Sequence, residues 1–435
     1  MKTLRIGAGA GFAGDRIDPA IELARDGRLD YLVFECLAER TIALAQLSKR
    51  QGRNAGFDPL LRARMEAVLP LCASNGTRII TNMGAANSEA AALETVSIAR
   101  SLGLTNMRVA WVAGDDVLHL LAGHMPADPR EHLVSANVYL GIEPILDALR
   151  GDGDVIITGR VADPSLFLAP MVHEFGWALD DWNRLGQGIA VGHLLECAGQ
   201  LTGGYFADPG YKDVMGLERL GFPIAEVDES GESLLTKLDK TGGGLTIRNC
   251  KEQILYEVHD PSNYMTPDVS ADFSTIRFAE IAPDKIHVSG AHGLERPMNL
   301  KVSIGLHAGF IADGQISYAG PGALARARLA REVLDHRLRW IASGDLRFDF
   351  VGIDSMHGAA LSDARTEPYE VRLRAAGRFF DEEQARLLMQ EVESLYVNGP
   401  AGGGGVVTSM RENIAMDAAF VPRASVVTSI GMEVV

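Results

Sequence analysis

Short apolar runs alternate with helical patterns along roughly the first 160 residues of the chain. This alternation is typical of βαβ units, in which neighbouring strands run parallel and helices cover both faces of the sheet. We predict strands at Leu4–Ala8, Leu29–Phe34, Thr77–Thr81, Met107–Val112 and Val155–Thr158. We predict helices near Asp18–Arg25, Thr41–Arg50, Pro59–Ser74, Glu89–Leu102 and Ile142–Leu149. The N-terminal lobe is therefore expected to be α/β, with a parallel sheet and helices on both faces.

The pattern changes near residue 210, after which β-rich runs are separated by Gly, Asp and Pro. The candidate strands in this part are Val227–Leu238, Leu245–Ile247, Ile254–Val258, Ile286–Val288, Leu300–Leu306 and Phe310–Tyr318. Residues 301–334 and 347–396 each follow the order strand, strand, helix, which predicts an α+β lobe with helices on one face of an antiparallel sheet. We expect two lobes, formed by residues 1–210 and 211–435.

Polar side chains follow each of the five N-terminal strands at the point where the strand ends. In chain order they are Asp15, in a glycine-rich turn with Gly9, Gly11 and Gly14, and then Glu35, Asn82, Asp115, Arg160 and Asp163. Because the carboxyl ends of parallel strands meet at one edge of the sheet, the residues are expected to share a crevice that binds an anionic or hydroxylated small molecule. Each of them can also be explained singly, as a helix cap or an ordinary polar loop residue.

Two glycine-rich segments raise the question of phosphate binding. Gly9–Gly14 matches G-x-G-x-x-G, and Glu35 closes the next strand, as in a dinucleotide-binding fingerprint. However, the following helix is predicted to begin only at Asp18, too late for its N-terminus to meet a pyrophosphate. The second segment, Asn398–Gly405, includes Gly403 and Gly404 and is either an anion-binding loop or a flexible linker. It lacks the lysine of a P-loop.

One His–Glu pair has the spacing of an acid/base pair. His193 and Glu196 stand three residues apart, which places both side chains on one face of a helix. A buried structural histidine is the alternative. Cys197 follows directly and is either a nucleophile or a small apolar core residue. No second motif of this kind occurs, and we assign no metal ligands.

Composition narrows the classes of partner and compartment. The chain has 41 Lys and Arg against 57 Asp and Glu, a formal charge of −16, which disfavours nucleic acid and anionic membranes as partners. Its four cysteines lie far apart, which argues against a disulfide framework and suits a reducing compartment. No export signal or membrane-spanning run is recognised. We expect a cytoplasmic protein that forms a homo-oligomer.

Several long blocks of the sequence resemble the acyclic terpene utilisation AtuA-like family. They are residues 9–16 (GAGFAGDR), 30–46 (DYLVFECLAERTIALAQ), 80–87 (ITNMGAAN), 155–177 (VIITGRVADPSLFLAPMVHEFGW), 192–206 (GHLLECAGQLTGGYF) and 316–319 (ISYA). The resemblance implies a role in catabolism of citronellol- and geraniol-type compounds through CoA thioesters. Longer members carry an extra C-terminal domain that is similar to a separately encoded small protein, so the resemblance also implies a small partner subunit. It implies no established reaction and no list of catalytic residues.

The leading hypothesis is an enzyme that acts on a branched or unsaturated carboxylic acid, or on its CoA thioester, by hydration, dehydration or a related proton-transfer lyase reaction. Such chemistry needs an acid, a base and a group that holds the carboxylate or thioester oxygen. We expect Arg160 to be the anion clamp and Glu35 and Asp163 to be the acid and base. No cofactor is assigned, and a CoA thioester is a candidate substrate.

The remaining candidates have supporting roles. Asn82 and the Gly9–Gly14 backbone are expected to orient the substrate, Asp115, Gly403 and Gly404 to contribute to binding, and His193 with Glu196 to be the second choice for catalysis. Two alternatives stay open: a non-catalytic acyl-CoA-binding or scaffold subunit that works with a small separate partner, and a nucleotide-dependent oxidoreductase.

Overall fold

The chain folds into two compact units, described here by a computed structural model that covers all residues except 1, 53–54, 122, 124–125, 341–345 and 363–367. The first unit contains residues 1–123, 135–304 and 416–435, and the second contains residues 124–134 and 305–415. This division differs from the expected boundary at residue 210, which lies inside the first unit. The reason is that strands after residue 210 extend the sheet of the first unit instead of starting a new one.

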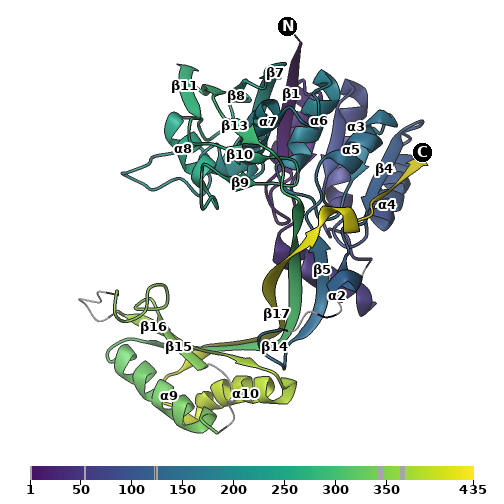
Figure 1. Ribbon diagram of the computed structural model, residues 1–435. Helices are drawn as coiled ribbons and strands as arrows, with labels where there is room; N and C mark the ends of the chain where they lie inside the picture. The colour runs from purple at the N-terminus through teal and green to yellow at the C-terminus, as the bar shows by residue number, and fades with distance from the viewer. Residues whose placement is uncertain (1, 53–54, 122, 124–125, 341–345, 363–367) are drawn as a thin grey trace. The chain divides into compact units, whose positions relative to one another are not determined.

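The first unit is built on a ten-stranded sheet, ordered β11-β12-β8-β7-β1-β2-β3-β6-β4-β18 (Figure 1). Its five central strands are parallel, as the sequence predicts: β1 (Thr3–Ala10), β2 (Tyr31–Phe34), β3 (Arg78–Thr81), β6 (Val155–Ile157) and β4 (Arg108–Ala113). All four residues of β2 are buried. Such a continuous apolar run is typical of a parallel strand that helices cover on both faces.

The helices of the first unit form two packed groups. One group is α1 (Asp18–Asp26), α3 (Leu61–Asn75) and α4 (Ser88–Ser101), and the other is α5 (Glu143–Arg150), α6 (Ser165–Phe175) and α7 (Trp182–Leu195). The chain moves along the sheet in one direction from β1 to β4 and in the other from β4 through β6 to β7. Because crossovers are right-handed, the two directions place the two helix groups on opposite faces.

This reversal places the switch point of the sheet between β3 and β6. The chain leaves β3 toward α4 on one face and leaves the neighbouring β6 toward α6 on the other. Adjacent strands whose connections diverge in this way leave an opening at their carboxyl ends, where ligands of open α/β sheets bind. The predicted polar strand ends of Asn82 and of Arg160 to Asp163 lie at this point.

Antiparallel strands extend both edges of this sheet. They are β7 (Pro223–Asp228), β8 (Ser233–Lys237), β12 (Lys285–Ser289) and β11 (Arg277–Ala282) beyond β1, and β18 (Ser429–Val434) beyond β4. The strands expected at Leu245–Ile247 and Ile254–Val258 are wrong, since this segment forms α8 (Ile247–Leu255). A small sheet of β9 (Tyr264–Met265), β10 (Ser270–Asp272) and β13 (His292–Leu294) packs on α7. Helix α2 (Glu39–Arg50) follows β2.

The second unit has the α+β layers that the sequence predicts. Its sheet has the order β15-β16-β14-β17, and β5 also pairs with β14. The strands are β5 (His132–Val138), β14 (Asn299–Ala319), β15 (Leu346–Val351), β16 (Glu370–Phe379) and β17 (Gly404–Pro422). The helices are α9 (Ala323–Leu338) and α10 (Glu382–Asn398). Figure 1 shows α9 and α10 side by side, and both pack on β16. Buried and outward-facing side chains alternate along β16, which explains this packing: Val371 and Leu373 are buried, and Arg372 and Arg374 face outward.

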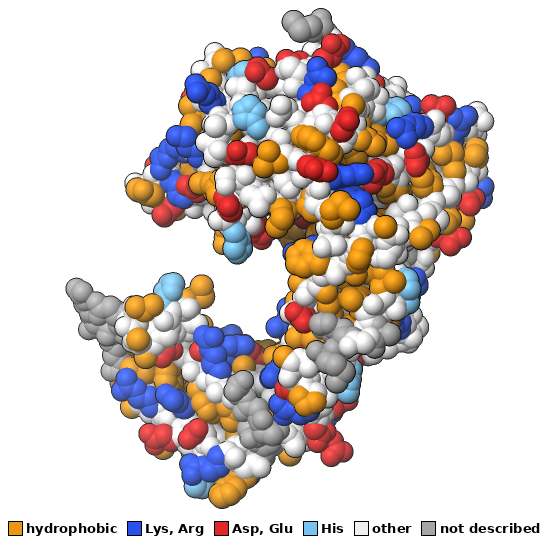
Figure 2. Space-filling model, viewed as in Figure 1, with side chains coloured by type: hydrophobic (Ala, Val, Ile, Leu, Met, Phe, Trp, Pro, Cys, Tyr) orange, Lys and Arg blue, Asp and Glu red, His pale blue; other side chains and the backbone are white. Residues whose placement is uncertain are grey.

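The surface of the second unit is charged and mixed in sign. Figure 2 shows acidic and basic side chains interspersed over it, and several of them form ion pairs, among them Arg337 with Glu391 and Arg374 with Asp313. Boundaries between the units fall inside β5, β14 and β17, which therefore belong partly to each.

Candidate active site

Glu35 and Asn82 meet behind the ends of β2 and β3. Glu35 Oε1 accepts hydrogen bonds from Asn82 Nδ2 at 2.9 Å and from the Leu37 backbone N–H at 2.8 Å. Asn82 Oδ1 in turn accepts the Cys36 backbone N–H at 2.7 Å. Both side chains are buried. The Glu35 carboxyl group is therefore held in one orientation, with Oε1 occupied as an acceptor.

Arg160 follows β6 and is buried completely, unlike the anion clamp that we expected from the sequence. Its Nε–H donates to the Val161 carbonyl at 2.9 Å, and its other nitrogens donate to the Leu37 carbonyl and to Asp163 Oδ1. The guanidinium also stacks on the Tyr139 ring, 4.6 Å from its centroid. Because the guanidinium group donates its hydrogen bonds to groups of the protein itself, Arg160 holds Asp163 and the turn in place and does not extend to a ligand.

Asp115, after β4, fixes the backbone of the same turn. Its Oδ2 accepts the Arg160 backbone N–H at 3.0 Å and Asn137 Nδ2 at 2.8 Å. Burial raises the pKa of Asp115 to about 6. With its side chain only 7% exposed and engaged in this way, Asp115 supports the turn from behind and does not line the neighbouring cavity.

A cavity of about 270 Å³ opens beside Asp163. Its wall carries Tyr139 and Glu39, whose side chains are hydrogen-bonded to each other, and Lys301, whose Nζ lies 3.5 Å from Glu39 Oε1 and 5.0 Å from the Tyr139 ring centroid. Glu257, Tyr264, Thr266 and Asn299 complete its polar lining. We call this space the Asp163 cavity. Sequence reasoning missed Tyr139 and Lys301, because neither directly follows one of the predicted parallel strands.

Several carboxyl groups around Arg160 hold protons more tightly than usual. Burial raises the pKa of Glu35 to about 8, and the nearby charge of Asp163 adds to the effect while Arg160 opposes it. Burial also raises the pKa of Asp163, against the lowering influence of Arg160. For Arg160, burial alone would lower the pKa, but the interactions with Asp163, Tyr139, Glu35 and Glu39 together outweigh it and raise the pKa. Carboxyl groups that exchange protons near neutral pH are what acid/base catalysis needs.

His193 and Glu196 form a buried pair at the end of α7, as their spacing predicts. His193 Nδ1 lies 2.7 Å from Glu196 Oε1, and the imidazole packs against Tyr264, with ring centroids 5.1 Å apart. Burial lowers the pKa of His193 to about 4, and burial, followed by the charge of Asp163, raises that of Glu196. Among the described residues, neither His193 Nε2 nor Glu196 Oε2 has a hydrogen-bond partner. Both shifts favour the uncharged forms of these side chains, and the pair keeps unused hydrogen-bonding capacity.

The glycine-rich turn after β1 satisfies its own polar groups. Asp15 accepts the Gly11 backbone N–H at 2.9 Å and the Arg16 N–H at 2.8 Å. The buried Arg64 donates to the Ala13 carbonyl at 2.9 Å, and to those of Phe12 and Asp15. Helix α1 begins only at Asp18. A carboxylate thus occupies the place where a dinucleotide fingerprint offers N–H groups to phosphate, which removes the basis of the oxidoreductase alternative.

Of the other predicted glycines, Gly9, Gly11, Gly14 and Gly403 are closely packed, whereas the space beside Gly404 is open. A Cβ at Gly9 would collide with the Phe34 ring, one at Gly11 with the Cys197 backbone, and one at Gly14 with the Phe12 ring. Gly403 and Gly404 belong to the second unit, at the turn from α10 into β17, where a Cβ at Gly403 would meet Ile316 and Tyr318. The structure brings Glu35, Asn82, Asp115, Arg160 and Asp163 together, with His193 and Glu196 nearby.

Comparison with known proteins identifies the family. The sequence pattern of the family described as "Acyclic terpene utilisation family protein AtuA" matches residues 4–432, nearly the whole chain. The chain belongs to the AtuA family. The name of the AtuA family links this chain to acyclic terpene utilisation, a catabolic role. No curated protein matches the chain.

One solved structure that matches is the de novo designed protein Ferredog-Diesel. It is 16% identical over 23% of this chain and 85% of its own, and its TM-score is 0.17. Within the described part of this AtuA family chain, no helix is long and apolar enough to cross a membrane. Among the same residues, no group of three or more His, Cys, Asp or Glu side chains is arranged to hold a metal ion.

Proposed function

We propose that this AtuA family protein is an enzyme that acts on a branched or unsaturated carboxylic acid, or on its CoA thioester, by hydration, dehydration or a related proton transfer. One observation carries the proposal. Two carboxyl groups with raised pKa values, Glu35 and Asp163, flank a buried arginine at the strand ends of a parallel sheet, and one of them lines a cavity. A pair of this kind can hold and pass one proton between its members.

Asp163 is the group that exchanges a proton with the substrate, because it lines the cavity and its side chain is 35% exposed. In a dehydration, its carboxylate takes the proton from the carbon next to the carboxyl or thioester group. Asp163 then gives that proton to the hydroxyl on the following carbon, which leaves as water, and the electron pair of the broken C–H bond forms the double bond. Hydration is the reverse. Arg160 is a positioning residue that orients Asp163.

Glu35 is the buried proton store behind Asp163. Its Oε1 already accepts two N–H groups, so the proton of the neutral form resides on Oε2. Since the pKa is raised to about 8, Glu35 is mostly protonated at neutral pH and can return a proton to the site after each turnover. Asn82 fixes the carboxyl group for this role.

Lys301 is the best-placed cation for the substrate's carboxylate or thioester oxygen. Its side chain is half exposed, at 50%, and it borders the Asp163 cavity. A lysine at the wall of a cavity can approach an anionic group as a point charge. This assignment replaces Arg160 as the anion clamp. The small partner subunit and the homo-oligomer stay predictions.

The test uses the purified chain with 3-methyl-branched 3-hydroxy acids and the matching 2-enoic acids, each as free acid and as CoA thioester. We expect interconversion of one pair, and exchange of the hydrogen next to the carbonyl when the reaction runs in deuterated water. Asp163→Asn should abolish both, and Lys301→Met should raise KM more than it lowers kcat. Binding without exchange or turnover would overturn the proposal and favour a non-catalytic acyl-binding subunit.

A further inference from the structure

Tyr264 lies in the wall of the Asp163 cavity, and its ring is held by two neighbouring rings. The ring centroid of Tyr264 is 5.1 Å from that of His193 and 5.2 Å from that of Phe273. The centroids of His193 and Phe273 are 5.9 Å apart. Three rings that contact one another in this way restrict the movement of each. The Tyr264 hydroxyl is therefore held at one place beside the cavity.

The hydroxyl of Tyr264 is not used by the protein. Within the described part of the chain it has no hydrogen-bond partner, and its oxygen stays in contact with open space, unlike the shielded His193 Nε2 and Glu196 Oε2. Tyr139, the other tyrosine of the cavity wall, has its hydroxyl bonded to Glu39. A largely buried phenol usually finds a partner. The free hydroxyl of Tyr264 therefore indicates a partner that enters the cavity.

The other neutral polar groups of this wall are engaged or open to bulk water, and the base and the cation of the proposed reaction are already assigned. Thr266 donates its hydroxyl to the Val269 carbonyl at 2.8 Å and accepts the Val269 backbone N–H at 3.1 Å. Asn299 is exposed, as is the carboxylate residue Glu257. Of the described wall residues, Tyr264 is therefore the neutral polar group that is both fixed in place and free to bind.

The surroundings of Tyr264 make its hydroxyl a hydrogen-bond donor. Burial raises the pKa of Tyr264 well above its ordinary value, and the nearby carboxyl groups of Glu196 and Asp163 add to the effect. The hydroxyl therefore keeps its proton at neutral pH. A protonated hydroxyl on the same cavity as Asp163 can donate to an oxygen atom of a substrate while Asp163 acts as the base.

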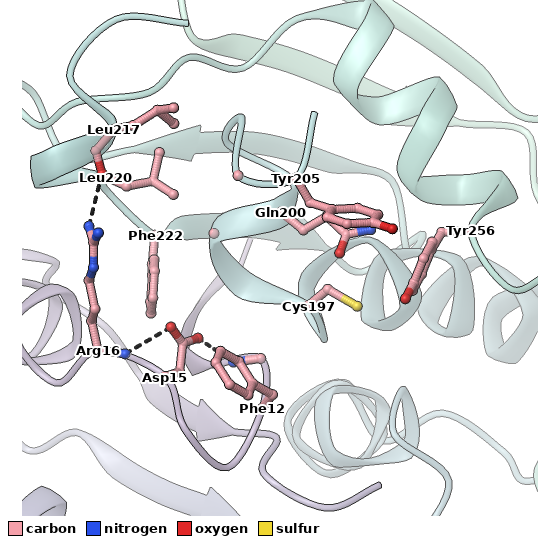
Figure 3. A pocket seen from close by; sticks show the side chains of 13 residues that line it. Phe12, Asp15, Arg16, Cys197, Gln200, Tyr205, Leu217, Leu220, Phe222 and Tyr256 are labelled. Carbon is pink, nitrogen blue, oxygen red and sulfur yellow. Dashed lines mark hydrogen bonds between the residues drawn. The ribbon is translucent and has the colours of Figure 1, made fainter. Parts of the chain in front are cut away.

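A second cavity, of about 480 Å³, lies at the carboxyl end of β1 (Figure 3). We call this space the Cys197 cavity. Its wall is mainly apolar and includes Phe12, Phe222 and Tyr205. Among the described residues, none lines both this cavity and the Asp163 cavity, and none of the acid/base groups of the proposed reaction lines the Cys197 cavity. The Cys197 cavity therefore supplies a tyrosine for comparison.

We propose that the Tyr264 hydroxyl binds the oxygen that is lost or gained as water in the proposed reaction. This inference rests on the proposed function and names the residue that recognises the hydroxyl group of a 3-hydroxy acid. As the C–O bond breaks, its electron pair stays with the oxygen, which receives the proton from Asp163. Tyr264 donates a hydrogen bond to that oxygen throughout and keeps its own proton. In hydration, the same hydrogen bond holds the attacking water.

The first experiment is steady-state kinetics on Tyr264→Phe, which removes one oxygen and keeps the packing of the ring. With the substrates of the proposed reaction, kcat should fall about 10²- to 10³-fold, as on removal of one donor that stabilises charge in a transition state. Tyr205→Phe is the matched control, because it removes the same oxygen from the wall of the Cys197 cavity, where Tyr205 is 90% exposed. The control should keep kcat within about twofold of the wild type, because none of the reacting groups lines that cavity.

The second experiment separates recognition of the hydroxyl from a structural effect. In the inactive Asp163→Asn variant, titration calorimetry gives Kd for a 3-hydroxy acid and for the saturated acid that lacks the hydroxyl, each in the form that the wild type turns over. With Tyr264 present, the 3-hydroxy acid should bind about tenfold more tightly, which corresponds to one hydrogen bond. In the double variant Asp163→Asn/Tyr264→Phe, the two acids should bind within about twofold of each other, because that bond is lost.

The inference alone is wrong if the wild type turns over its substrate and Tyr264→Phe keeps its kcat. It is also wrong if the preference for the 3-hydroxy acid survives in the double variant, because Tyr264 then has a structural role only. A loss of kcat in Tyr205→Phe as large as in Tyr264→Phe would show that the effect does not belong to the Asp163 cavity. If the wild type turns over no acid or thioester, the proposed function fails and the inference fails with it.

Discussion

Two strand ends of the same sheet use the same structural device with different results. Arg64 and Arg160 are the two largest side chains that are fully buried, and each holds the turn that follows a parallel strand through bonds to backbone carbonyls. In the turn after β1, both oxygens of Asp15 accept N–H groups of that turn. In the turn after β6, Asp163 is held by Arg160 and faces a cavity.

The difference teaches that a polar strand end is not by itself a catalytic site. Each turn carries an aspartate that the sequence marks as a candidate, and each is held by a buried arginine: Arg160 belongs to the β6 turn itself, and Arg64 reaches the β1 turn from α3. The two turns differ in what the carboxylate binds. Both oxygens of Asp15 accept backbone N–H groups of their own turn, whereas Asp163 is bonded to Arg160 and lines the Asp163 cavity. We therefore assign the chemistry to the β6 turn and the shaping of the neighbouring apolar wall to the β1 turn.

The strongest test of this contrast is Asp163→Asn. Loss of a positioned acid/base group costs about 10²- to 10⁴-fold in rate, and Asn Oδ1 can still accept the bond from Arg160, so the fold should survive. Asp154→Asn is the matched control, because Asp154 precedes the same strand at its opposite end and accepts the Arg108 backbone N–H. Steady-state kinetics on both variants decide the matter. Equal losses would show that the position of Asp163 is not special.

Next in size is the pair Arg160→Met and Arg64→Met. Each should lower the free energy of unfolding by about 3–5 kcal/mol, because removal of one partner leaves buried polar groups unsatisfied. Denaturant unfolding measures this loss. Assayed at a temperature where both variants are folded, only Arg160→Met should lose most of its activity. An equal loss of activity with Arg64→Met would end the distinction between the two turns.

A pH profile sharpens the assignment of Glu35. Its pKa in the folded protein, about 8, lies above the ordinary value near 4.5. In that window the folded state binds the proton and the unfolded state does not, so the contribution of Glu35 to stability falls as the pH rises from about 4.5 to 8 and is constant above. Glu35→Gln should become more stable relative to the wild type over this window. A difference independent of pH in thermal unfolding would contradict the raised pKa.

The smallest effect is expected from Asp15→Asn. Asn can accept only one of the two N–H groups that Asp15 holds, so one is left without its bond, at a cost of about 1–3 kcal/mol. The melting temperature should fall accordingly. Activity toward short acids should fall at least tenfold less than with Asp163→Asn. A loss as large as that of Asp163→Asn would give Asp15 a chemical role.

Much of the first unit could be predicted because its signals are local. Each parallel strand is a short apolar run bounded by turn residues, and the rule for strand ends then brings Glu35, Asn82, Arg160 and Asp163 to one edge. The spacing of His193 and Glu196 likewise suffices to predict their contact. These inferences need only the periodicity of a strand or a helix.

The rest depends on contacts between distant segments. Nothing near Lys301 or Tyr139 indicates that both border the Asp163 cavity. The two strands predicted at Leu300–Leu306 and Phe310–Tyr318 form a single strand, β14. Gly309 lies between the two predicted ranges with a φ of 80°, and the strand continues beyond it. Helix α8 has few apolar residues, and its short apolar runs resemble those of strands in the sequence. The contact of α8 with α7, a distant segment, is what favours the helix.

The pairing of β18 with β4 bears on how the protein is made. β18 lies more than 300 residues after β4 in the chain, yet the two strands are neighbours at the edge of the main sheet. During synthesis, β4 emerges from the ribosome long before its partner and keeps a row of unpaired backbone groups, which other chains could join. Release of the nascent chain before residue 429 would leave that edge open for good.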